Sequence, residues 1–131
     1  MKPMWERRAL QLAVALGGLV PVCAGLAGAA LGPEMIPGAA ESAALDSHHR
    51  YLSGLLLGIG LGFWSAIPSI ERRTARVRLL GAVVVVGGLA RVLGLTEHGW
   101  PGVMGWALVM ELAVTPLLVL WQGRVARLAA P

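Results

Sequence analysis

The sequence is poor in charge and nearly free of cysteine. Only 14% of its 131 residues are charged, whereas soluble domains carry about 25%. The one cysteine, Cys23, lies inside an apolar run, so a disulfide within the chain is excluded. P-loop, CxxC and nucleophile–histidine–acid patterns are missing too, so the sequence indicates no catalytic residue and no cofactor. This composition favours a membrane protein over a soluble enzyme.

Apolar sequence is abundant instead: hydrophobic residues make up 56% of the chain, and the mean hydropathy is +0.71. The apolar runs are about 17 to 23 residues long, close to the ~20 that cross ~30 Å of hydrocarbon. The first is too long for the apolar core of a secretory signal peptide, which has about 7–15 residues. We therefore predict a single domain, residues 1–131, with an all-α fold: an integral membrane four-helix up-down bundle. Its spans are expected at about residues 9–31, 49–68, 77–96 and 102–121.

Basic residues are missing from two of the three connecting loops. The loops after the first and third spans carry acidic residues but no lysine or arginine. Nine of the eleven basic residues lie near the N-terminus, in the middle loop or near the C-terminus, which four spans place together on the opposite side of the membrane. By the positive-inside rule, both termini and the middle loop are cytoplasmic. The net charge of +4 is then a topological signal, and no nucleic-acid partner is predicted. The nine residues are Lys2, Arg7, Arg8, Arg72, Arg73, Arg76, Arg78, Arg124 and Arg127.

The four arginines of the middle loop have a second possible role. A cationic cluster beside a span attracts anionic lipid headgroups. We favour the topological explanation for this cluster, because such residues ordinarily set orientation.

Small residues recur at helical spacing in the second span. Gly54, Gly58 and Gly62 follow one another every four residues and form a stripe on one helix face. Gly87 and Gly88 provide a second small surface in the third span. Small residues let membrane helices approach closely. We expect these glycines to pack helices within the monomer, with a dimer interface as the alternative.

Two charges of opposite sign interrupt the last two spans. With a rise of 1.5 Å per residue, Arg91 lies about 6 Å below the outer surface and Glu111 about 12 Å below it. An extended guanidinium can bridge this difference and bind a carboxylate through two hydrogen bonds. Arg50 adds a cation at the outer end of the second span. Since ionisable residues inside a span are costly, we hypothesise that Arg50, Arg91 and Glu111 converge at a functional site.

Three explanations of this cluster remain open. Arg91 and Glu111 could form a buried ion pair that only fixes helix register. Alternatively, two cations facing one carboxylate leave a positive charge for an anion or a polar headgroup. A proton or ion relay is the third explanation, but the inner half of the bundle offers no further titratable group.

Tyr51, His49 and His98 are secondary candidates, because they lie near the outer ends of these helices. No metal site is predicted. The adjacent residues His48 and His49 would point about 100° apart on a helix and could not easily share one ion.

Three segments together resemble a known family. They read HHRYLSGLLLGIGLGF, GGLARVLGL and HGWPGVMGWALVMELAVTPLL. Their order and spacing resemble the small bacterial membrane-protein family called domain of unknown function 4345, most specifically at Arg50-Tyr51, Gly87-Gly88-x-x-Arg91 and Glu111. The resemblance implies a four-helical, multi-pass protein of the bacterial inner (plasma) membrane with no assigned activity. A similarity to the DoxX-like membrane proteins, some associated with quinone-linked oxidoreductases, is architectural and transfers no cofactor.

The expected function is that of a non-enzymatic binding or accessory protein. An outward-facing polar pocket lined by Arg50, Arg91 and Glu111 would hold a lipid-like or quinone-like amphiphile. The alternative is a structural subunit of a larger membrane complex, in which Arg91 and Glu111 only fix helix register. The expected partners are the lipid bilayer and either an amphiphilic small molecule or another membrane protein.

Overall fold

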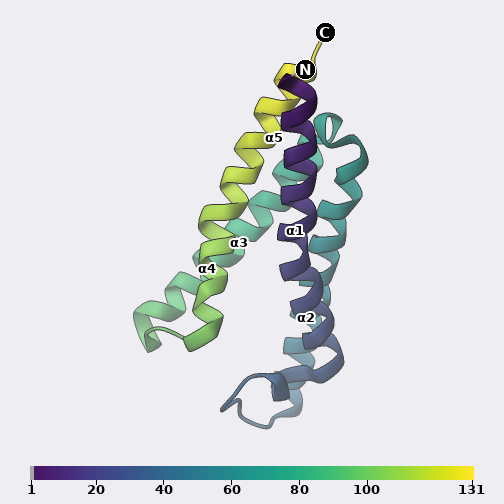
Figure 1. The fold of residues 1–131 in the computed structure, drawn as a ribbon. Coiled ribbons are helices and arrows are strands. Elements are labelled where there is room, and N and C mark those ends of the chain that lie inside the picture. Colours follow the sequence, from purple (N-terminus) through teal and green to yellow (C-terminus); the bar gives the residue numbers. More distant parts are fainter. Residues whose placement is uncertain (1) are drawn as a thin grey trace. The chain divides into compact units, whose positions relative to one another are not determined.

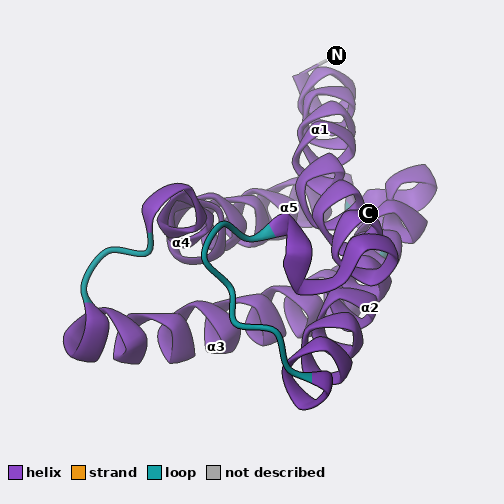
Figure 2. Cartoon of the chain, turned by 90° about the horizontal axis from the view of Figure 1, so that it is seen from below, coloured by secondary structure: helices purple, strands orange, loops and turns teal. Residues whose placement is uncertain are grey.

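The computed structural model describes residues 2–131, with side chains from Met4 onward. The side chain of Lys2, which contributes to the predicted orientation, lies outside this description. The described chain consists of helices and connecting loops, without a strand (Figure 2). Four segments are long and apolar enough to cross a membrane, and each extends beyond its predicted span: Met4–Met35, Ala43–Arg72, Thr74–His98 and Gly102–Ala129. The predicted all-α, four-span fold is confirmed.

Figure 1 shows the order of the elements along the chain, from purple at the N-terminus to yellow at the C-terminus. Long helices alternate with short 3₁₀ segments, and the fourth span contains one π-helical segment. The elements are α1 (Lys2–Leu31), η1 (Gly32–Met35), α2 (Ala43–Ala66), η2 (Ile67–Arg72), α3 (Thr74–His98), η3 (Gly102–Trp106), α4 (Ala107–Val109), the π-helical η4 (Met110–Val114) and α5 (Thr115–Ala129).

Local chemistry explains where two of the long helices begin or end. The Oγ of Ser42 accepts a hydrogen bond from the backbone N–H of Leu45 at 3.4 Å, which caps the start of α2. Gly99 ends α3 with a φ of 77°, and its N–H donates to the carbonyl of Leu95. Because Ser42 caps the helix this early, α2 begins six residues before the predicted span.

The contacts of the chain define two compact units. Unit 1 contains residues 1–13 and 68–131, and unit 2 contains residues 14–67. The helix α1 contributes its first part to unit 1 and the rest to unit 2. Inside each unit the contacting helices run antiparallel, as an up-down arrangement requires.

Glycines of α1 provide the closest approach between the two helices of unit 2. A Cβ added to Gly25 would lie 2.5 Å from the backbone nitrogen of Leu57 and 2.7 Å from the carbonyl oxygen of Ser53. No side chain fits at this position, so the two backbones are in direct contact. Further along the same interface, the indole Nε1 of Trp64 donates a hydrogen bond to the carbonyl of Ala15 at 3.2 Å.

Gly54 and Gly58 of the α2 glycine stripe are not part of this contact. Gly54 and Gly58 are exposed, and a Cβ on either would meet no atom of unit 2 within 4 Å. Gly60, outside the stripe, faces α1 instead, and a Cβ added there would lie 2.7 Å from the Cγ2 of Val22. A packing role for Gly54, Gly58 and Gly62 therefore stays a prediction. For Gly54 and Gly58 it needs a neighbour outside this hairpin.

In unit 1, α3 lies against the fourth span. A Cβ on Gly88 would come within 2.8 Å of the Cδ2 of Leu112 and 2.9 Å of the Cβ of Glu111. Gly81, two turns earlier on α3, faces Val119 of α5. Gly87 has no atom of unit 1 within 4 Å of its Cβ position, so Gly88 and not Gly87 makes the close approach.

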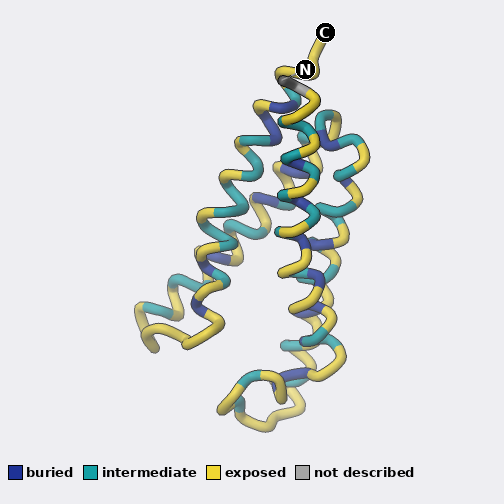
Figure 3. The backbone as a smooth tube through the Cα atoms, viewed as in Figure 1, coloured by how far each residue is buried: buried dark blue, intermediate teal, exposed yellow. Residues whose placement is uncertain are grey.

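The best-buried part of unit 1 is the end rich in arginine, formed by residues 4–8, 68–78 and 122–131 and called the arginine end below. Figure 3 shows buried residues as short dark-blue stretches between exposed ones. Elsewhere α3 and α5 expose large apolar side chains, which suits contact with lipid. The largest side chains that are almost completely buried are Ile70, Val77, Gln122 and Val125 at this end and Leu10 just beyond it.

Candidate functional site

Arg91 of α3 and Glu111 of η4 are in direct contact. The Nε of Arg91 donates to Oε2 of Glu111 at 3.2 Å, and its Nη2 donates to Oε1 at 3.0 Å. This parallel pair of charge-assisted bonds is the strongest arrangement the two groups can adopt. The two side chains remain 33% and 17% exposed. The ion pair is thus formed within unit 1 but is not completely enclosed by it.

Two backbone features bring Glu111 to Arg91. Gly88 lets the η4 backbone approach α3 one turn before Arg91, because a larger side chain would collide with Leu112.

Pro116 lacks the N–H that a regular α-helix needs, and the preceding segment widens into the π-helix that carries Glu111. The hydroxyl of Thr115 donates to the carbonyl of Met110 at 2.7 Å, which satisfies an acceptor in the widened turn. Pro116 is thus accommodated by a π-helical turn in the segment that precedes it.

Arg50, the third predicted member of the cluster, belongs to unit 2 and has partners there. Its Nε donates to Oδ2 of Asp46 at 2.9 Å, one turn earlier on α2. Its Nη1 donates to the carbonyls of Ala29 and Ala30 at 2.8 and 3.1 Å. These carbonyls belong to the last turn of α1, where the helix itself supplies no partner. Arg50 therefore caps α1, and its convergence with Arg91 and Glu111 stays a prediction.

The secondary candidates occupy different settings. Tyr51 is 64% exposed. His98 lies 3.8 Å from Glu97, and both side chains are largely exposed. The Nε2 of His49 is buried without a hydrogen-bond partner, beside Gly28 of α1. In the part of the chain with described side chains, no three His, Cys, Asp or Glu residues come together as a metal site would need.

Two open cavities of similar size are lined by residues away from the ion pair. One, of about 490 Å³, lies along the loop between α1 and α2, from Pro33 to Asp46. The other, of about 500 Å³, lies at the arginine end between Met4, Arg7, Arg72 and Val125. Arg91 and Glu111 line neither cavity. The ion pair therefore lies outside both cavities, and the polar groups it offers to a ligand are those on its exposed surface.

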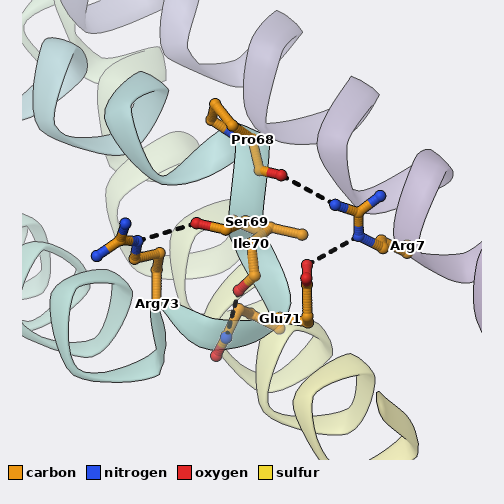
Figure 4. Close-up of polar contacts among 7 residues, drawn as sticks. Arg7, Pro68, Ser69, Ile70, Glu71 and Arg73 are labelled. Atoms are coloured by element: carbon orange, nitrogen blue, oxygen red, sulfur yellow. Dashed lines mark hydrogen bonds and ion pairs between the residues drawn. The ribbon is translucent and has the colours of Figure 1, made fainter.

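Polar contacts at the arginine end fix the turn between α2 and α3 (Figure 4). Arg7 of α1 donates its Nε to Glu71 at 2.8 Å and its Nη2 to the carbonyl of Pro68 at 2.9 Å. The carbonyl of Ile70 accepts from Nε2 of the fully buried Gln122 at 2.8 Å. The sequence favoured a topological role for the arginines here, with attraction of anionic lipid headgroups as the alternative. The one feature of the sequence that could have indicated a structural ion pair here is Glu71, an acidic residue next to the middle-loop arginines.

Comparison with known proteins identifies a family that matches the chain. No curated protein and no solved structure matches the chain. The family described as "Domain of unknown function (DUF4345)" matches residues 9–122, from the first span through the fourth. This range includes Arg50, Arg91, Glu111 and the glycines discussed above. The resemblance seen in the sequence is thereby confirmed, and the chain belongs to the DUF4345 family.

Proposed function

We propose that this protein is a non-enzymatic binding or accessory protein of the bacterial inner membrane. Its ligand is an amphiphile, lipid-like or quinone-like, whose polar group lies against Arg91 and Glu111. Both residues belong to helical segments that are long and apolar enough to cross a membrane. Both termini are proposed to be cytoplasmic, so the pair lies in the outer half of the bilayer.

The single observation that carries this proposal is the incomplete enclosure of the Arg91–Glu111 pair. About a third of the Arg91 side chain is exposed, although a charged group in hydrocarbon is costly. The Nη1 of Arg91 adds donors beyond the two nitrogens that bind Glu111. A polar headgroup against this surface would accept these donors and shield the pair from lipid. The π-helical turn at Glu111 supports the same conclusion, because such turns occur frequently at functional sites.

Mass spectrometry of the purified protein tests this proposal. The full chain is isolated in a mild detergent, alongside Glu111→Gln and the matched control Glu97→Gln, which removes an exposed carboxylate. We expect wild type and the control to retain the same lipid or quinone, and Glu111→Gln to lose it. Far-UV circular dichroism verifies that each variant keeps its helices. A wild-type protein without any bound amphiphile contradicts the proposal.

The second candidate function is that of a structural subunit. It is favoured by the glycines that face no neighbour within their own unit, Gly54 and Gly58 on α2 and Gly87 on α3. Such small surfaces suit a helix of another membrane protein. In the experiment above, this function predicts a membrane protein that stays bound in stoichiometric amount, with no amphiphile at the ion pair.

A further inference from the structure

We propose that the arginine end of unit 1 binds a phosphate group between Arg78 of α3 and Arg127 of α5. Both side chains are exposed and extend over the buried Gly123. The Nη2 of Arg78 and the Nη1 of Arg127 each lie 3.9 Å from the position that a Cβ of Gly123 would take. The two cationic nitrogens are therefore at most twice that distance apart.

The carboxylates at this end are already bound by other arginines. Arg124 holds Glu6 through two bonds of 2.9 and 3.0 Å. Glu71 is held by Arg7 at 2.8 Å. Among the side chains that the structure describes, the ion pairs thus supply no carboxylate to Arg78 or Arg127. Two like charges face the same space, and an anion from outside the chain would neutralise them.

Phosphate fits this space by chemistry and by size. Guanidinium groups bind phosphate oxygens through charge-assisted bonds of about 2.7–2.9 Å. One phosphate can bridge the two nitrogens with separate oxygens, since their separation does not exceed twice 3.9 Å. Gly123 carries no side chain that would fill the gap. The phosphate comes either from an anionic lipid headgroup, which the cytoplasmic leaflet offers in abundance, or from free phosphate.

Two probes distinguish these sources on the full chain. Inorganic phosphate is titrated in a phosphorus-free maltoside detergent, with binding followed by ³¹P line broadening. Phosphatidic acid is offered in nanodiscs as an equimolar mixture with phosphatidylcholine, and retained lipid is counted by native mass spectrometry. We expect retention of phosphatidic acid over phosphatidylcholine. Binding of inorganic phosphate as well identifies a site for any phosphate group, and its absence identifies a lipid site.

Variants locate the site and separate it from general surface charge. Arg78→Gln and Arg127→Gln should each weaken binding about tenfold, because each removes a charged hydrogen-bond donor. Gly123→Ala keeps the charge and places a methyl group in the gap, so binding should weaken as well. The control Arg8→Gln removes an exposed arginine of the same end and should bind like wild type.

Three results would overturn the inference. One is a wild-type protein that binds neither probe. Another is an Arg8→Gln variant that loses as much affinity as Arg78→Gln, which would indicate unspecific attraction. The third is unchanged binding in Gly123→Ala. Circular dichroism of every variant ensures that weaker binding does not reflect unfolding.

Discussion

At the scale of single residues, the Arg91–Glu111 contact should contribute to stability as well as to binding. Replacing one partner by glutamine leaves the other charged without its counter-ion and with at most part of its two hydrogen bonds. We expect Glu111→Gln and Arg91→Gln each to lower the free energy of unfolding by about 1–3 kcal/mol. Thermal unfolding in detergent, followed by tryptophan fluorescence, measures the change. The control Glu97→Gln should shift stability by less than about 0.5 kcal/mol. Equal effects of Glu111→Gln and this control would contradict the assignment.

Arg50 should act through the end of α1. Arg50→Ala leaves the carbonyls of Ala29 and Ala30 without their donor and frees Asp46. The expected loss is about 1–2 kcal/mol of stability, similar to the loss of a helix cap. The same unfolding measurement, with the exposed Arg8→Ala as the matched control, checks it. A stable Arg50→Ala protein that has lost only ligand binding would instead place Arg50 in the binding site.

The two cases show what sequence can predict at this scale. Arg91 and Glu111 are rare charges on consecutive apolar helices, so their contact can be expected from composition and spacing alone. Besides Asp46, the partners of Arg50 are backbone carbonyls of a helix end 20 and 21 residues earlier. Because every residue carries a carbonyl, no side-chain pattern marks these two, and the capping role could not be predicted.

At the scale of elements, the α1–α2 contact depends on the missing side chain of Gly25. Gly25→Leu must push the two backbones apart, since its Cβ alone would lie 2.5 Å from the nitrogen of Leu57. We expect a loss of about 1–3 kcal/mol or more, as for an overpacked core. Gly54→Leu provides the matched control, because that position is open within unit 2. Thermal unfolding should rank Gly25→Leu well below Gly54→Leu. The opposite ranking would mean that the α2 stripe makes the essential contact.

The spans could be predicted from the sequence where a long apolar run marks them. The four spans were predictable because about 20 apolar residues in succession have few other uses. The π-helical turn at Glu111 was missed, since a proline five residues later predicts a kink but not its form. The contacts that Gly25 and Gly60 make between α1 and α2 were not predicted either, and packing by the α2 stripe stays a prediction. Gly54, Gly58 and Gly62 form the more regular stripe, yet a stripe does not identify its neighbour.

At the scale of the whole molecule, orientation follows from charge and can be tested directly. In a Cys23→Ala background, Ala40→Cys reports on the loop before α2, and Ala75→Cys reports on the start of α3; both positions are exposed. We expect a membrane-impermeant maleimide to label Ala40→Cys in intact spheroplasts. Ala75→Cys should react only after lysis, because the positive-inside rule predicts a cytoplasmic middle loop. Labelling in the reverse order would invert the topology and move the ion pair to the inner half of the bilayer.

The contacts of the chain define two compact units, whereas the single domain expected from the sequence stays a prediction. Hydropathy identifies spans one at a time, and it carries little information about which spans share contacts. The units depend on details such as the bonds of Arg7 to Glu71 and Pro68, which join the start of α1 to the turn before α3. These contacts bring together residues more than 60 positions apart, and no local pattern predicts them.

The most direct measurement compares wild type with the charge-swapped double variant Arg91→Glu/Glu111→Arg, in both stability and bound amphiphile. A swap can restore the ion pair, but it moves the guanidinium to the other helix. We predict that the double variant recovers stability lost in the single variants and yet retains much less amphiphile than wild type. An equal amount of bound amphiphile in both proteins, or none in wild type, would contradict a binding role and leave a pair that only fixes helix register.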